Sequence, residues 1–136
     1  MDSRVLHVDT AGREVVDLTD ELEDFCLGSG DGLCSAFAPH ATAGLALMET
    51  GSGSEADLVV ALGRLLPRPG EYRHRHGAPG HGADHLLPAI VSPSMVVPVL
   101  GGKPALGTWQ RLVLVDLNAD NRHRQVRLSF VAAPDS

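Results

Sequence analysis

The sequence predicts an α+β fold, a single compact domain with an antiparallel β-sandwich core and two or three helices. Three observations support this prediction. The chain has 136 residues, of which 43% are hydrophobic, and this fits one domain over residues 1–136 with a substantial core. Segments with strand-like patterns dominate the second half of the chain. Helical spacing of apolar residues is confined to a few short segments.

The first half of the chain is expected to contain three strands. Residues 3–9 form the first of them. Residues 33–39, which are rich in small side chains, form a second strand that leads to His40. Residues 42–48 form a third, because leucines alternate there with smaller residues.

Two helices are expected in the same half. Asp20 with Glu23 three residues later resembles a capping box, and the glycine-rich segment 28–32 ends that helix. Ser54 with Asp57 gives a second helix-start pattern, and leucines at helical spacing follow it. Two prolines then end the second helix, because proline cannot continue one.

The second half is expected to be mainly strands. Residues 95–100 form one strand, and Pro98 within it indicates a sheet edge or a bulge. Two consecutive glycines then make a hairpin turn. Residues 111–117 and 125–131 have the clearest strand patterns, and we expect residues 118–122 to join them as an antiparallel pair.

Charge and cysteine content exclude some classes of function. The formal net charge of −6 disfavours a sequence-independent nucleic-acid binder, which needs a positive surface facing phosphate. The first residues lack the apolar region of a signal peptide, and the apolar runs are too short to span a membrane. We therefore expect a cytoplasmic protein with no membrane partner, in which Cys26 and Cys34 are reduced and buried.

Histidine is the residue that most clearly points to chemistry. The chain has seven, and four of them crowd into a glycine-rich loop between Gly70 and Asp84 or directly after it: His74, His76, His81 and His85. Imidazole binds metals and transfers protons near neutral pH. His81 and His85 are four residues apart and would share one face of a helical turn, although the neighbouring glycines disfavour a helix there. The alternative is a solvated loop with polar filler.

Other residues suggest an anion site or a ligand-stacking surface. Arg122 and Arg124, with backbone N–H groups near Gly107, would suit phosphate, although the arginines could equally form a solvated strand face. Glu49 follows an apolar strand and could orient an imidazole or bind a cation. Trp109 is either packed in a core or interface, or a wall on which an aromatic ligand ring stacks.

Six blocks of sequence, taken in order, resemble the YjbQ-like family. They are His40-Ala-Thr-Ala-Gly-Leu, Glu49, Tyr72-x-His74, His85-Leu86, Ser94-x-x-x-Pro98-Val99 and Leu106-Gly107-Thr108-Trp109-Gln110. Members of that family were long described as proteins of unknown function and are now often labelled secondary thiamine-phosphate synthases. The resemblance runs over nearly the whole chain.

The resemblance implies a fold, an assembly and a site. It implies a compact α+β fold with a β-sandwich core, a homotrimer, and a pocket lined by histidines. The matching positions are His40, His74 and His85, with Glu49, Trp109 and Gln110, and more loosely Arg122 and Arg124. Two departures favour an all-imidazole site over an acidic cation site. Met48-Glu49-Thr50-Gly51 lacks an amide and a carboxylate common in the family, and His81 replaces an asparagine.

The functional hypothesis combines these residues. We expect a transferase of the thiamine-phosphate synthase type, which joins a hydroxymethylpyrimidine diphosphate to a thiazole phosphate and releases diphosphate. The expected catalytic residues are His40, His74, His85 and Glu49. The expected substrate-binding residues are Thr42, Trp109, Gln110 and Arg124. The expected ligands of a divalent metal, zinc or magnesium, are His40, His74, His85 and His81.

Two alternatives to this hypothesis involve no catalysis. In the first, the same residues bind a metal or a small anion in a non-catalytic homotrimer. In the second, the histidines only seal contacts between subunits.

Overall fold

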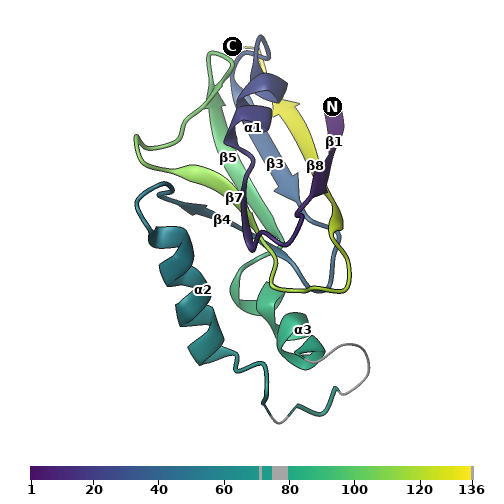
Figure 1. Ribbon diagram of the computed structural model, residues 1–136. Helices are drawn as coiled ribbons and strands as arrows, with labels where there is room; N and C mark the ends of the chain where they lie inside the picture. The colour runs from purple at the N-terminus through teal and green to yellow at the C-terminus, as the bar shows by residue number, and fades with distance from the viewer. Residues whose placement is uncertain (71, 75–79, 136) are drawn as a thin grey trace.

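The strands form two antiparallel sheets, and helices pack around them (Figure 1). The computed structural model describes residues 1–70, 72–74 and 80–135. The strands are β1 (Asp2–Asp9), β2 (Val15–Asp17), β3 (Gly32–Phe37), β4 (Gly44–Met48), β5 (Ser94–Leu100), β6 (Lys103–Pro104), β7 (Arg111–Val115) and β8 (His123–Ala132). The helices are α1 (Thr19–Cys26), α2 (Ser54–Leu65) and α3 (His81–Ile90). The predicted α+β class is confirmed.

The two sheets enclose the main core. The larger sheet has the order β1-β8-β3-β5-β6, and the smaller has the order β2-β7-β4. Alternate residues of β8 (Val126, Leu128 and Phe130) face Leu112 and Leu114 of β7 across this core. In the larger sheet, β1, β3, β5 and β8 therefore each have one buried face, as expected for a β-sandwich.

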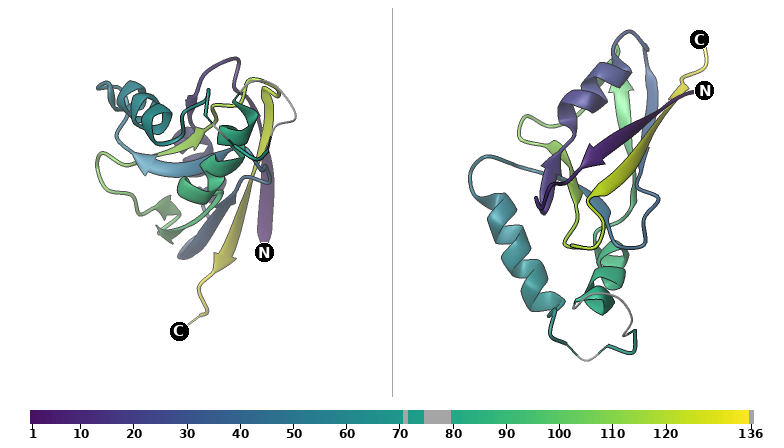
Figure 2. Two further views of the ribbon diagram at one scale, coloured as in Figure 1. Left: turned by 90° about the horizontal axis from the view of Figure 1, so that it is seen from below. Right: turned by 45° about the vertical axis from the view of Figure 1, so that its right-hand side comes forward.

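The outer face of the smaller sheet carries a second core. Val113 and Val115 of β7 pack there against α2 and α3, through Leu62 and Leu87 among others. Both α2 and α3 lie at one end of the molecule, and the two chain termini lie at the other (Figures 1 and 2). Because β7 is covered on both faces, its residues 112–115 form a continuous apolar run with no polar alternation.

The predicted pairing of residues 111–117 with residues 125–131 is wrong. β7 pairs with β2 and β4, whereas β8 pairs with β1 and β3 in the other sheet. Residues 116–122 therefore cross from one sheet to the other. The physical reason lies in the burial patterns, because β7 is buried on both faces and β8 on one.

The predicted helix caps are also wrong. The residue before α1 is Leu18, which has no polar side chain, and the N–H of Thr19 instead donates to Asp17 Oδ1 at 2.9 Å. α2 does begin at Ser54, but after Gly53 in a left-handed conformation (φ 97°). The short strand β2 was not predicted, and its three residues give too little pattern for a period to be read.

The last part of the histidine-rich segment is helical. α3 begins at His81, directly after Gly80 in a left-handed conformation (φ 87°), where we expected a loop as far as Asp84. Gly82 fits because of a close approach: a Cβ there would lie 2.7 Å from Tyr72 Cβ. Glu71 and residues 75–79, which include His76, lie outside the described residues.

Candidate metal centre

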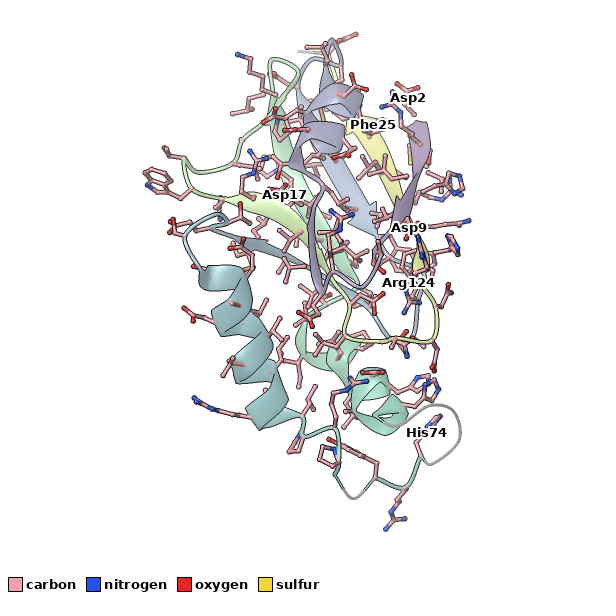
Figure 3. The ribbon with its side chains drawn as sticks, viewed as in Figure 1. Asp2, Asp9, Asp17, Phe25, His74 and Arg124 are labelled. Carbon is pink, nitrogen blue, oxygen red and sulfur yellow. The ribbon has the colours of Figure 1, made fainter. Side chains whose placement is uncertain are left out.

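Three of the predicted histidines come together at the N-terminal end of α3. His81 and His85 are one turn apart on that helix, and His74 lies beside it in the preceding segment (Figure 3). One ring nitrogen from each of the three lies within 4.8 Å of the others. His81 Nε2 and His85 Nε2 are 2.9 Å apart. All three side chains are half-buried.

The spacing of these nitrogens suits a tetrahedral metal ion. Zinc–imidazole bonds of about 2.0–2.1 Å put neighbouring ligand nitrogens about 3.3 Å apart. The His81–His85 separation is already near that value, and the 4.8 Å limit leaves at most about 1.5 Å to close for His74. Three imidazoles are the donor set of an open zinc site, whereas magnesium prefers oxygen ligands. The donor chemistry therefore favours zinc.

Packing and one ion pair position α3. Leu87 and Ala83 bury its inner face against Val113 and Val115. On the same helix Asp84 is buried and pairs with the Arg68 guanidinium, which ties the segment after α2 to α3. Asp84 lies between two of the histidines in sequence, so this ion pair also fixes their helix.

The chain segment between β7 and β8 approaches the same histidines. Asp120 Oδ2 in this segment lies 3.2 Å from His81 Nδ1, on the side of the ring away from His85. Asn118 Nδ2 donates to Asp84 Oδ2 at 3.0 Å. The centre is thus bounded by α3, by the segment that carries His74, and by the crossing between the sheets.

His40 is not in this group of ligand nitrogens. Its Nε2 accepts a hydrogen bond from the backbone N–H of Gln125 at 2.9 Å. Burial lowers the pKa of His40, and the nearby Arg124 guanidinium lowers it further. A neutral ring that accepts at Nε2 carries its proton on Nδ1. In this conformation His40 is therefore a hydrogen-bond donor through Nδ1.

Thr42 and Arg124 are adjacent in the interior. Arg124 Nη2 donates to Thr42 Oγ1 at 2.8 Å, and Arg124 Nε donates to Asp116 Oδ2 at 2.6 Å. Both side chains are buried. The guanidinium charge that we assigned to phosphate is therefore balanced by a carboxylate of its own chain.

Three predicted residues lie at the end of the β4–β7 pair that is opposite to Asp116: Glu49, Trp109 and Gln110. Glu49 follows Met48, which pairs with Arg111, whereas Asp116 follows Val115 at the other end of the ladder. At about 3.4 Å per residue the two ends are about 14 Å apart. The Trp109 side chain is 72% exposed, so core packing within one chain does not explain it.

Sequence reasoning missed the residues that surround the histidines. Asp84, Asn118 and Asp120 were not predicted: Asp120 lies beside His81, and Asn118 donates to Asp84 on the helix that carries two of the histidines. One signal was available. Asp116, Asn118 and Asp120 place an amide or carboxylate at every second position directly after an apolar strand.

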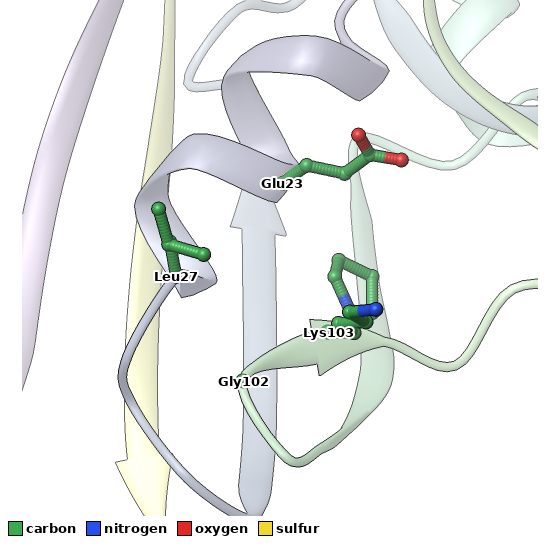
Figure 4. Close-up of a pocket in the computed structure, with 5 residues that line it drawn as sticks. Glu23, Leu27, Gly102 and Lys103 are labelled. Carbon is green, nitrogen blue, oxygen red and sulfur yellow. The ribbon is translucent and has the colours of Figure 1, made fainter.

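Two hollows in the surface contain none of the three clustered histidines. A pocket of 310 Å³ lies between α1 and the β5–β6 hairpin, lined by Glu23, Leu27, Gly102, Lys103 and Pro104 (Figure 4). Another, of 260 Å³, is lined in part by Asp116, Asn118 and Arg122. This second hollow borders the sheet-crossing segment.

No helix in the described part of the chain is long and apolar enough to cross a membrane.

Relatives of this chain match its sequence over most of its length. The chain is 66% identical over 131 residues to UPF0047 protein Rv2556c of Mycobacterium tuberculosis, covering 96% of this chain and 98% of the relative. It is 34% identical over 122 residues to a UPF0047 protein of Archaeoglobus fulgidus, covering 89% and 95%.

Two solved structures are closely similar. The crystal structure of hypothetical protein APE1520 from Aeropyrum pernix superposes with a TM-score of 0.88 at 30% identity, covering 98% of this chain and 100% of that one. A YbjQ-like protein of unknown function from Sulfolobus solfataricus superposes with a TM-score of 0.90 at 26% identity, covering 97% of each chain. The family model described as UPF0047 protein YjbQ-like matches residues 4–133. The chain therefore belongs to the YjbQ-like UPF0047 family.

Proposed function

We propose that this protein binds a zinc ion at His74, His81 and His85 and uses the centre to bind a small phosphorylated molecule in the cytoplasm. The observation that carries the proposal is the convergence of three ring nitrogens within 4.8 Å of one another. Three neutral nitrogen ligands leave the ion its full positive charge and one open position. A phosphate oxygen is a suitable ligand for that position.

The reaction that we propose for this site is a thiamine-phosphate synthase-type transfer. The bond between the pyrimidine CH₂ and the diphosphate oxygen breaks, and the electron pair leaves with diphosphate. The thiazole nitrogen lone pair forms the new C–N bond, so the product is a cation and no proton is transferred. When bound, the zinc ion supplies positive charge to the leaving diphosphate. His40 donates its Nδ1–H to a substrate oxygen.

Metal binding and turnover are tested separately. Untagged protein is analysed for bound metal, stripped with a chelator, and titrated with zinc and then with magnesium by calorimetry. We expect one zinc per chain and much weaker magnesium binding. His74→Ala should abolish tight zinc binding, whereas His123→Ala, an exposed histidine outside the group, should leave it unchanged. Equal zinc binding by wild type and His74→Ala would overturn the proposed centre.

Turnover is measured as thiamine phosphate formed from the two substrates. Product that depends on zinc and on His74 supports the transferase. Zinc and inorganic phosphate binding without any product favours the non-catalytic binding protein, and the proposal then stops at binding.

A homotrimer is the second proposal, and the outer face of the larger sheet supports it. Leu33 on β3 is paired with Val131 on β8 and lies diagonally across from Val96 on β5, and each of the three is more than half exposed. A continuous apolar area of this kind commonly marks a protein interface. In such a trimer a neighbouring copy could bring Glu49, Trp109 and Gln110 to the histidines of the next.

Light scattering of the purified protein tests the assembly. A Val96→Lys variant should yield monomers if this face is the interface, while the exposed Val60→Lys on α2 should not. A trimer that survives Val96→Lys would show that another face is used. If the trimer also survives alanine at His40, His74 and His85 together, the histidines do not serve only to seal subunit contacts.

A further inference from the structure

Asn118 connects three parts of the candidate metal centre. Its side chain donates from Nδ2 to the buried Asp84 carboxylate of α3 at 3.0 Å. Its Oδ1 accepts from the backbone N–H of Asp120 at 2.9 Å and from that of Asn121 at 3.3 Å. Asn118 is itself buried. One amide thus uses both ends to join the helix that carries His81 and His85 to the loop that carries Asp120.

These contacts form a closed ring. His81 and Asp84 lie in the first turn of α3, and Asp84 accepts from the Asn118 amide. The same amide accepts from the backbone N–H of Asp120. The Asp120 carboxylate in turn lies 3.2 Å from His81 Nδ1, which closes the ring of contacts. The Asp120 side chain is 37% exposed, so its own packing does not fix it in this position. The buried amide two residues earlier is what holds the loop.

The position of Asp120 beside the His81 imidazole indicates which ring nitrogen would bind a metal. The Asp120 carboxylate lies within ion-pair distance of Nδ1, although the contact does not have hydrogen-bond geometry. A carboxylate at this distance favours the neutral tautomer with its proton on Nδ1 and its lone pair on Nε2. Nε2 is the atom that faces His85, at 2.9 Å. A carboxylate on the outer nitrogen of a ligating imidazole fixes the tautomer and the orientation of the ring, and its loss commonly weakens metal binding 10–100-fold.

We propose that Asn118 is a positioning residue, which presents Asp120 to His81 and so prepares His81 Nε2 to bind the metal. This inference rests on the proposed zinc centre and adds residues that touch no metal. It implies that Asn118 and Asp120 act mainly through one contact, the one between the Asp120 carboxylate and His81, although Asn118 also donates to Asp84 of the same helix.

Zinc affinity in a double-mutant cycle tests this inference. The variants are Asn118→Ala, Asp120→Ala and both together. Each single change should weaken zinc binding about 10–100-fold. The double variant should bind zinc about as tightly as Asp120→Ala alone. Asn121→Ala is the matched control. Asn121 accepts from the His123 N–H in the same loop and should leave zinc affinity unchanged.

A second measurement needs no metal. In metal-free protein, ¹⁵N NMR of the His81 ring should show the proton on Nδ1 in the wild type and in Asn121→Ala. The two tautomers should be mixed in Asn118→Ala and Asp120→Ala. If Asn118→Ala proves too unstable, Asn118→Ser keeps an acceptor for the Asp120 N–H and should show an intermediate effect.

The outcomes distinguish the two proposals. Wild-type protein that binds no zinc overturns the proposed function, and this inference with it. Wild-type protein that binds zinc while Asn118→Ala binds equally well overturns only the positioning role. Additive losses from Asn118→Ala and Asp120→Ala would also contradict it, because the two residues would then act independently.

Discussion

Arg124 and Asp116 form an ion pair in the interior of the protein. Arg124 Nε lies 2.6 Å from Asp116 Oδ2, and the two side chains are 4% and 1% exposed. The pair is completed by Thr42, whose hydroxyl accepts from the same guanidinium. It lies where the chain leaves β7 to cross between the sheets, directly before the loop that approaches the histidines.

Removal of one member of this pair should strongly destabilise the fold. Asp116→Ala leaves a buried guanidinium without its counter-charge, and we expect a loss of about 3–5 kcal/mol in the free energy of unfolding. Urea denaturation measures it. The exposed pair Arg122–Asp9 offers the control, because Arg122→Ala should cause no measurable change. Equal effects at both pairs would show that burial is not the cause.

Two helical glycines should respond oppositely to alanine. Gly63→Ala in α2 meets open space and should stabilise the protein by about 0.5–1 kcal/mol, because alanine favours helix. Gly82→Ala in α3 would place a Cβ 2.7 Å from Tyr72 Cβ and 2.9 Å from the His74 carbonyl oxygen. It should therefore destabilise the protein and weaken zinc binding. Thermal unfolding and zinc titration of both variants test this contrast.

The lowered pKa of His40 predicts a pH dependence of stability. Its pKa in the folded protein lies below the usual 6.5, mainly because burial disfavours the charged ring. The unfolded chain therefore binds a proton at His40 before the folded protein does. The protonation of His40 therefore leaves the free energy of unfolding unaffected well above pH 6.5 and lowers it as the pH falls below 6.5.

Comparison with His40→Gln isolates the contribution of His40 to the pH dependence of stability. The loss of unfolding free energy between pH 7.5 and pH 5.5 should be smaller in the variant than in the wild type. NMR titration of the His40 ring gives its pKa directly. A value above 6.5 would contradict the prediction.

The two cysteines should be unreactive in the native protein. Cys26 and Cys34 are free and buried. Burial raises the pKa of Cys34 to about 12 and also raises that of Cys26, so little of the reactive thiolate is present at neutral pH. A thiol reagent such as dithionitrobenzoate should react slowly with native protein at pH 8 and with both cysteines after denaturation. Rapid reaction under native conditions would be evidence against this burial.

Local patterns predicted most of the elements but not their pairing. Alternation along residues 125–131 identifies β8, because that strand has one buried face. The same reasoning failed for the partner of β7, since Val113 and Val115 are buried by helices that lie far away in sequence. The continuous apolar run was the available clue, and it indicates a strand covered on both sides.

The candidate site was predictable only in its residue types. A dense group of histidines indicates metal chemistry, and His74, His81 and His85 do converge. Which histidines meet depends on where α3 begins, and Gly82 in its first turn allows a close approach of Tyr72 that a side chain would block. His40 instead accepts from the Gln125 backbone, a contact between residues 85 positions apart that no local pattern reveals.

The double burial of β7 has a consequence for how this protein melts. One face of the strand belongs to the sandwich interior, and the other supports α2 and α3. Detachment of the helices would expose Val113 and Val115, at a cost of roughly 1.5–3 kcal/mol for each side chain. Heat should therefore dismantle the imidazole cluster and the sheets in one cooperative step, so the histidine signals and the far-ultraviolet dichroism should vanish at the same temperature.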